Sequence, residues 1–396
     1  DRFGALPAAQ PLLRRLEGWT GDVYLVGGAV RDLMLGEQPV DLDLMVPGPV
    51  DGIVERLGGG LVSHDRFGTA GGEMDGHRYD LARARKETYT HPGALPEVDP
   101  GDVEADLSRR DFTVNAIALG VLGPGSGRLI AFGPALADLE EGLLRVLHER
   151  SFVDDPTRLL RLARYAARLG FLVEAHTLEL ARRALAEQAL DQVSGARIGA
   201  ELRLLAAEAD PVAGFVTLRR LGLDQALAPG FGVTDPGGVT RGLGLLPADG
   251  SRPALVIGAA GFALRAAERA ALLNGLAFPA QERDRILDAA TAPELSHRLR
   301  RARKPSEIAA AVGTRGPEAV ALAGALGAED PARLWLEELR QVRLQISGAD
   351  LLAAGLRPGP ALGRGLAAAL AARLDGEAES VEAQLAVALK TAGEGN

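Results

Sequence analysis

Two aspartates one residue apart, Asp41 and Asp43, are the residues of this chain best suited to chemistry. They lie in a run where apolar and acidic side chains alternate, and this period of two predicts a half-buried strand. Side chains at i and i+2 of a strand point to one face, so both carboxylates project together. Paired carboxylates favour a divalent cation such as Mg²⁺, and two such ions can clamp both oxygens of a phosphoryl transfer.

A glycine pair, Gly27 and Gly28, follows an apolar segment and precedes a predicted helix that carries Arg31. Glycines at a helix start leave backbone N–H groups open to phosphate oxygens. Together with the aspartates, this order predicts a nucleoside triphosphate site, although each feature alone also fits an ordinary turn or a solvated edge strand. Asp80 ends another short strand and is either a third catalytic carboxylate or a solvated aspartate.

Two further segments supply candidate nucleotide contacts. Arg109 and Arg110 precede an apolar segment that predicts a helix with Asp111 as its N-cap. The arginines suit a phosphate or a ribose, and Asn115 lies one turn further on, within reach of the same ligand. Capping alone would also explain Asp111.

The segment 151–171 predicts a helix that begins at Asp155 and Pro156. One face of this helix is basic and carries Arg158, Arg161, Arg164 and Arg168. A solvated amphipathic helix would show the same pattern. However, Asp155 offers hydrogen-bond acceptors and Arg158 offers donors. Cytosine and adenine each present a ring-nitrogen acceptor beside an exocyclic amine, so this pair predicts selection of C and A over G and U without a template.

The C-terminal half carries candidate contacts to an RNA backbone. A dense basic run spans 298–304, and a glycine-flanked helix start lies near 359. The residues concerned are Arg298, Arg300, Arg301, Gly359 and Arg364. A solvated basic face and a tight turn between helices are the alternatives. A helix after Ser194 carries Glu201, which is predicted to brace the preceding helix.

The secondary structure that must position these residues is predicted to change in type near residue 139. Strands are predicted at 23–26, 40–46, 78–82 and 128–132, mixed with helices, and 90–102 is predicted as a loop. Beyond 139 nearly everything reads as helix, so the fold class is α+β followed by all-α. No apolar run is long enough to cross a membrane. No pattern specifies an oligomeric state.

Composition narrows the class of protein. The 396 residues include no cysteine, which excludes disulfides and thiolate metal sites and indicates a reducing cytoplasm. The net charge of −9 argues against a nonspecific nucleic-acid binder but permits a local basic patch. The chain begins with Asp1 and not Met, which is consistent with a piece of a longer protein.

Five ordered motifs resemble the bacterial class II tRNA nucleotidyltransferases, the CCA-adding enzymes and their poly(A) polymerase relatives. The motifs are LVGGAVRDLMLG with VDLDL, RRDFTVNAIAL, SFVDDPTRLLRLARYAARLGF, SGARIGAEL and SGADLLAAGLRPGPALG. The resemblance implies a polymerase-β-like catalytic head (1–138), a base-recognising neck (139–205), a helical body (206–305) and a tRNA-binding tail (306–396). It implies that Asp41 and Asp43 hold Mg²⁺, and that C or A residues from CTP or ATP are added to the tRNA 3′ end with release of pyrophosphate.

The resemblance also assigns roles to individual residues. It implies that Arg110 and Asp111 face the nucleotide sugar and that Asp155 and Arg158 read the base. Three departures are Asp154 in place of the usual glutamate, Ala131 where relatives often have aspartate, and a glycine-rich run after Thr69 where a regular strand is usual. The wording of 89–98 and 151–158 is closest to relatives that share the task, one adding CC and one adding A. A poly(A) polymerase and an inactive RNA-binding relative are the rival interpretations.

Overall fold

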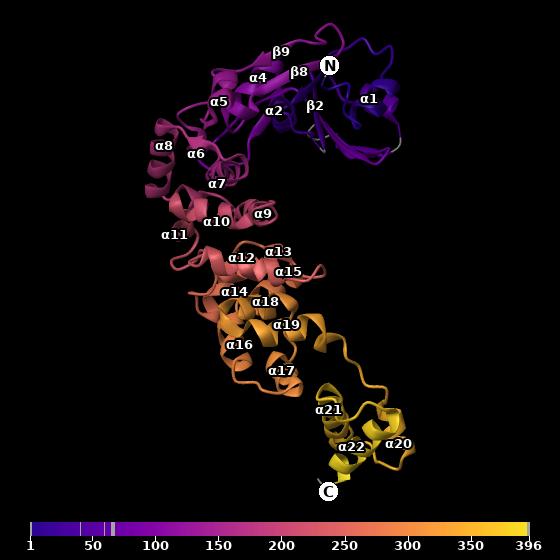
Figure 1. The fold of residues 1–396 in the computed structure, drawn as a ribbon. Coiled ribbons are helices and arrows are strands. Elements are labelled where there is room, and N and C mark those ends of the chain that lie inside the picture. The colour runs from indigo at the N-terminus through magenta and orange to yellow at the C-terminus, as the bar shows by residue number, and fades with distance from the viewer. Residues whose placement is uncertain (1, 40, 59, 65–67, 394–396) are drawn as a thin grey trace. The chain divides into compact units, whose positions relative to one another are not determined.

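The computed structural model describes residues 2–39, 41–58, 60–64 and 68–393. They form two compact units, one of residues 1–201 with 220–226 and one of residues 202–219 with 227–396. Figure 1 shows strands and helices in the first unit and helices in the second. The predicted division into a mixed part and a helical part is confirmed, whereas the predicted boundaries at 138, 205 and 305 stay predictions.

The centre of the first unit is a mixed sheet in the order β3-β4-β5-β2-β1-β8-β9. Its strands are β1 (Val23–Val26), β2 (Leu42–Val46), β3 (Leu61–His64), β4 (Thr69–Met74), β5 (His77–Arg83), β8 (Ile117–Leu122) and β9 (Leu129–Ala131). All four predicted strands are present, although β2 begins one residue after Asp41. Val40, predicted to open that strand, lies outside the described residues. Strand β2 pairs in parallel with β5, and most other pairs are antiparallel.

The remaining elements of the first unit surround this sheet and continue into a helical part. The first group is α1 (Ala9–Arg15), α2 (Gly28–Leu35), α3 (Asp51–Leu57), β6 (Arg85–Thr88), β7 (Glu97–Pro100), α4 (Val103–Ser108), η2 (Thr113–Asn115) and α5 (Ala135–Glu141). The second is β10 (Leu143–Leu144), α6 (Ser151–Asp154), α7 (Thr157–Leu169), β11 (Leu172–Val173), α8 (Ala175–Ala186), η3 (Ala189–Gln192) and α9 (Gly195–Ala206). Tyr24, Met45 and Leu107 of α4 share one buried cluster, so α4 covers the face of the sheet to which Met45 points.

Two predictions about this unit are wrong. The apolar segment after Asp111 is not a helix: it makes the short 3₁₀ turn η2 and then strand β8. Ile117 to Leu122 pairs with β1 on one side and β9 on the other, and this long-range pairing overrides the local helical pattern. The predicted loop 90–102 contains strand β7, which pairs with β6 through backbone hydrogen bonds that need no apolar alternation.

Within the second unit the described elements are helical. They are α10 (Pro211–Arg220), α11 (Leu223–Leu227), α12 (Pro236–Leu245), α13 (Arg252–Ala260), α14 (Ala266–Gly275), α15 (Ala280–Ala289), α16 (Ala292–Leu299), α17 (Pro305–Val312), α18 (Pro317–Ala323), η4 (Gly324–Ala328), α19 (Glu329–Glu337), η5 (Leu339–Gln341), α20 (Gly348–Ala353), α21 (Pro360–Leu374) and α22 (Val381–Gly393), with α10 and α11 spanning the boundary between units. The last three pack around Leu351, Ala369 and Ala388. None of the helices in the described residues is long and apolar enough to cross a membrane.

Candidate active site

Asp43 on β2 and Asp80 on β5 lie side by side in the sheet. They are register partners in a parallel pair, so their side chains point to the same face. Asp41 lies in a bend directly before β2, exposed like Asp43 and close enough to repel it. The fold therefore brings together the three aspartates that the sequence singled out.

The charges around Asp43 fit a divalent cation. Partial desolvation raises the pKa of Asp43, and the negative charges of Asp80 and Asp41 raise it further, against the opposing effects of Arg110 and Arg78. Neighbouring carboxylates that repel each other in this way are suitable ligands for a hard cation. Within the described residues no three His, Asp or Glu side chains enclose a metal by themselves, so water and substrate phosphates would complete its shell.

A cavity of about 370 Å³ extends from Asp43 toward the helical part of the unit. It is lined by Gly28, Asp43, Arg85, Glu87, Tyr89, Pro96, Arg109, Arg110, Asp111, Asn115, Asp155, Arg158, Arg161 and Tyr165. Most of the residues predicted to bind a nucleotide thus share one wall, whereas Gly27, Arg31 and Arg164 are not part of it. Its volume lies within the range of about 300–1,000 Å³ that is usual for small-molecule sites.

The glycine pair makes room for two arginines. Gly27 has φ +66°, and a Cβ atom there would lie 2.5 Å from Nη1 of Arg110. A Cβ on Gly28 would lie 3.3 Å from Nη2 of Arg31. Arg31 itself is 1% exposed and donates to Oδ1 of Asn115 at 2.5 Å and to the neighbouring Asp32. Its guanidinium therefore positions Asn115 and is turned into the protein, away from the cavity wall.

Asp155 and Arg158 both line the cavity, and hydrogen bonds to other residues of the protein hold their side chains. Oδ1 of Asp155 accepts from the Thr157 backbone at 3.1 Å and from Nη2 of Arg197 at 2.8 Å, and Oδ2 accepts no hydrogen bond within the described part of the chain. Arg158 donates to Oγ of Ser151 and to the backbone oxygen of Arg109, both at 2.7 Å. One carboxylate oxygen and several guanidinium N–H groups remain for a ligand.

Asp111 is committed to protein partners on both oxygens. Oδ1 accepts from the Phe112 backbone at 2.8 Å and from Nδ2 of Asn115 at 2.9 Å. Oδ2 accepts two hydrogen bonds from Arg161, at 2.8 and 2.6 Å. Burial alone would raise the pKa of Asp111, but the charge of Arg161 and these hydrogen bonds hold it well below its ordinary value. Asp111 therefore ties the catalytic sheet to helix α7.

The basic face of α7 packs against carboxylates. Arg158 and Arg164 are buried, and Arg161 and Arg164 pair with Glu201 at 3.3 and 3.5 Å. Arg168 reaches Asp32 on α2 at 3.3 Å. The prediction that Glu201 braces this helix is confirmed, and the basic stripe is a fixed part of the site because its charges have partners inside the unit.

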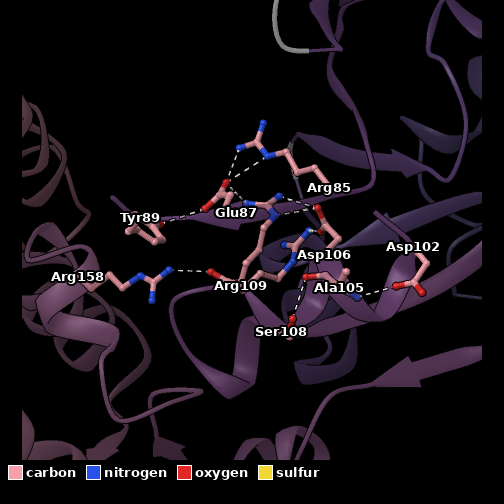
Figure 2. A network of polar contacts seen from close by, with 10 residues as sticks. Arg85, Glu87, Tyr89, Asp102, Ala105, Asp106, Ser108, Arg109 and Arg158 are labelled. Atoms are coloured by element: carbon pink, nitrogen blue, oxygen red, sulfur yellow. Dashed lines mark hydrogen bonds and ion pairs between the residues drawn. The ribbon is translucent and has the colours of Figure 1, made fainter. Parts of the chain in front are cut away.

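Figure 2 shows a polar network that the sequence did not reveal. The hydroxyl of Tyr89 donates to Glu87 at 3.1 Å, and burial beside Glu87 raises the pKa of Tyr89 to about 12. Glu87 also accepts from Arg109 at 2.8 Å, and Arg109 pairs with Asp106 at 2.6 Å. The only sign of this network in the sequence was the spacing of Arg85 and Glu87 at i and i+2. A polar strand shows no apolar periodicity from which it could be predicted.

In the second unit the candidate RNA contacts lie at helix ends. Arg298, Arg300 and Arg301 are exposed at the end of α16, and Gly359 directly precedes α21, which carries the exposed Arg364. Arg300 also borders a cavity of about 1000 Å³ together with Arg241, Arg303 and Arg333. These positions suit an anionic backbone.

Comparison with known proteins places this geometry in a family. The model of the poly A polymerase head domain matches residues 23–145. The CC-adding tRNA nucleotidyltransferase of Deinococcus radiodurans is 36% identical over 375 residues, which are 93% of this chain and 89% of that protein. The chain belongs to the class II tRNA nucleotidyltransferases. The family and the fold inferred from the five motifs are therefore confirmed, and members of this family use divalent metal ions.

Two further relatives extend the comparison. The A-adding tRNA nucleotidyltransferase of Geobacter sulfurreducens is 41% identical over 236 residues, 57% of this chain but only 27% of its own length. A solved structure described as a CCA-adding enzyme with ATP is 28% identical, has a TM-score of 0.78 and covers 96% of this chain and 94% of its own. The similarity to this structure thus extends over almost all of the chain, beyond the catalytic head.

Proposed function

We propose that this chain adds C or A residues to the 3′ end of tRNA, using CTP or ATP and releasing pyrophosphate. The observation that carries the proposal is the cavity in which Asp43, Arg110, Asp155 and Arg158 converge. Carboxylates at one end suit the reacting phosphate, and an acceptor–donor pair at the other end suits a base. We place the activity in the cytoplasm, in keeping with a chain that has no cysteine.

The chemistry is an in-line displacement at the α-phosphorus. The RNA 3′-hydroxyl forms the new P–O bond and loses its proton, while the bond to pyrophosphate breaks. Asp41 and Asp43, with Asp80 beside them, would hold Mg²⁺, which would activate the hydroxyl and stabilise the leaving group. Arg110 faces the phosphates from the cavity wall, and the N–H groups of the Gly27–Gly28 turn lie at the start of α2.

Base selection rests on Asp155 and Arg158. Oδ2 of Asp155 accepts from the exocyclic amine of cytosine or adenine, and Arg158 donates to the adjacent ring nitrogen. Guanine and uracil present the opposite order and leave both protein groups unpaired, which is costly in a buried site. Asp111, Asn115 and Arg161 orient the ribose side of the cavity, and Arg31 and Arg164 act as positioning residues because they are turned away from it.

The tRNA contacts beyond the 3′ end lie in the second unit. Arg298, Arg300 and Arg301 present exposed guanidinium groups, and Gly359 and Arg364 offer a helix start and a further cation. Such groups bind phosphate without reading sequence. Measured affinity for tRNA should therefore fall with salt concentration.

We further propose that the chain performs one share of CCA addition, either the two cytidines or the terminal adenosine. A CC-adding relative is 36% identical to this chain, and an A-adding relative is 41% identical to it over the part that matches. The test supplies tRNAs that lack CCA or only the terminal A, with one labelled nucleotide at a time, and sizes the products. Products that stop after CC identify a CC-adding enzyme, and extension only of CC-ending tRNA identifies an A-adding enzyme.

The same assay tests the rivals. A poly(A) polymerase, which the matched head-domain description also favours, would make long A tails on these RNAs. An inactive RNA-binding relative would bind tRNA without extending it. Asp41→Ala is the matched catalytic control: it should abolish extension and leave the fold intact, and turnover by that variant would refute the assignment.

A further inference from the structure

Asp106 on helix α4 holds two neighbouring arginines of the nucleotide cavity. Its Oδ1 accepts from Nε and Nη2 of Arg109 at 3.0 and 2.6 Å, and its Oδ2 accepts from Nη2 of Arg110 at 2.9 Å. The arginines follow Asp106 at i+3 and i+4, the spacing that brings side chains together on one face of a helix. One carboxylate therefore fixes two guanidinium groups.

Asp106 is a buried anion that does not line the nucleotide cavity. It is 1% exposed, and it borders a separate cavity of about 730 Å³ that also includes Asp43. Burial alone would raise the pKa of Asp106, but the charges of Arg110 and Arg109 and their hydrogen bonds hold it below its ordinary value. The carboxylate is therefore ionised, and it acts on a bound nucleotide through the arginines that it holds.

Arg110 depends on Asp106 more than Arg109 does. Arg109 also donates to Glu87 at 2.8 Å, as Figure 2 shows. For the Arg110 side chain, Asp106 is the one hydrogen-bond partner within the described parts of the chain, and Nε of Arg110 is enclosed without any partner there. On the other side, a Cβ atom on Gly27 would lie 2.5 Å from Nη1 of Arg110, so the glycine leaves the space that this guanidinium fills.

Arg110 also has a second carboxylate within electrostatic reach. Burial and the charge of Asp80 raise the pKa of Asp43, and the positive charge of Arg110 opposes that rise. A guanidinium released from Asp106 would therefore turn to Asp43. That pair would compete with a divalent cation for the carboxylate and would withdraw Arg110 from the phosphates.

We propose that Asp106 is a positioning residue of the nucleotide site, which aims Arg110 at the triphosphate and keeps it away from Asp43. The proposal rests on the proposed function, because the triphosphate is a substrate of that reaction. An arginine already held by a buried carboxylate loses less side-chain freedom when it binds a phosphate. Arg158 donates to the backbone oxygen of Arg109, so the same segment also supports the residue proposed to read the base.

Equilibrium dialysis of labelled CTP or ATP against the full chain, with Mg²⁺ and without tRNA, tests the proposal apart from turnover. Asp106→Asn keeps the shape of the side chain and removes its charge. It should raise the Kd of the nucleotide that the unchanged chain binds about tenfold, as the loss of one well-placed charged contact does.

The matched control is Asp138→Asn. Asp138 is 2% exposed and pairs with Arg145 at 3.0 Å, outside the nucleotide cavity. This variant also leaves a buried arginine pair without its negative charge, yet it should change the Kd of the nucleotide less than about twofold. An equal loss of affinity in Asp138→Asn would assign the effect to the fold and would overturn the proposal.

A double variant shows whether Asp106 acts through Arg110. In an Arg110→Ala background, adding Asp106→Asn should change the Kd less than about twofold, because the side chain to be aimed is already absent. A further tenfold loss in that background would overturn the proposal. So would an unchanged Kd in a folded Asp106→Asn variant.

Arg110→Lys decides the question if Asp106→Asn does not fold. Lysine keeps the charge but lacks the planar fork that contacts Asp106 and a phosphate at once, so the Kd should rise about tenfold. A Kd equal to that of the unchanged chain would refute the positioning role. Failure of the proposed function shows differently. An unchanged chain that binds CTP or ATP but extends no tRNA overturns only the proposed function, whereas one that binds neither nucleotide overturns both.

Discussion

The ion pair between Asp111 and Arg161 offers the sharpest test of how helix α7 is held against the catalytic sheet. Asp111 is 6% exposed, and its Oδ2 accepts both hydrogen bonds from Arg161. Arg161→Met keeps the apolar length of the side chain and removes its charge, which leaves a buried carboxylate unpaired. Breaking a buried pair in this way costs about 3–5 kcal/mol, and we expect about 3 kcal/mol because the Arg161 side chain keeps 33% of its surface exposed.

The loss of unfolding free energy in Arg161→Met should become smaller as the pH falls. In the unchanged chain the pKa of Asp111 lies well below its ordinary value, so its contribution to stability is complete above about pH 4 and disappears only as the pH falls through that depressed pKa. In Arg161→Met the effect of burial is unopposed by that charge, and the pKa of Asp111 should rise. The variant then takes up a proton on folding as the pH falls, so the difference in unfolding free energy between the two proteins should narrow from pH 7 to pH 5.

The assay is urea unfolding followed by tryptophan fluorescence. The chain has two tryptophans, and Trp335 lies in the second unit, so a Trp335→Phe background leaves Trp19 as a reporter of the first unit. Arg150→Met is the matched control, because Arg150 is 65% exposed in its pair with Asp154 and should cost less than about 1 kcal/mol.

A second substitution separates the buried charge from lost packing. Asp111→Asn combined with Arg161→Met removes both charges and should recover part of the lost stability, because no carboxylate is then left unpaired. A loss below about 1 kcal/mol in Arg161→Met, or a difference that does not change between pH 7 and pH 5, would refute the reasoning.

Four further predictions concern the site and the second unit. Arg158→Ala should relax nucleotide choice, and misincorporation assays that still show C and A preferred over G and U would contradict base reading. Arg197→Ala removes one of the hydrogen bonds that Oδ1 of Asp155 accepts and leaves those from Thr157. It should lower nucleotide selectivity with little change in the KM for tRNA, and the same assay with labelled nucleotides measures both. Asp43→Asn should abolish turnover yet raise the unfolding temperature slightly near pH 7. The pKa of Asp43 is raised in the folded chain, so its ionised form is disfavoured there. A lower unfolding temperature in Asp43→Asn would argue against carboxylate repulsion. Asp375→Ala removes two hydrogen bonds, each of 2.8 Å, to Ser306 at the start of α17, and should cost the second unit about 1 kcal/mol in urea unfolding followed at Trp335.

Local patterns predicted the parts of this molecule whose cause is local. The alternation around Asp43 and the glycine pair at the start of α2 follow from backbone rules that act within a few residues, and both are present in the structure. Helix α7 starts at Thr157, one residue after the predicted position of Pro156, and Asp155 accepts a hydrogen bond from the Thr157 backbone, an interaction between neighbours in sequence. The order of the five motifs then indicated the family and the class of reaction.

Long-range contacts determined the rest. The segment after Asp111 became a turn and a strand because β1 and β9 pair with it, which no local period could show. The apparent stripe of α7 became a set of ion pairs because Asp111, Asp32 and Glu201 come from distant segments. Sequence alone established which chemical groups are available and which short elements carry them. Their partners and the two cavities beside Asp43 depended on tertiary packing, because burial and opposite charge act between residues that only the folded chain brings together.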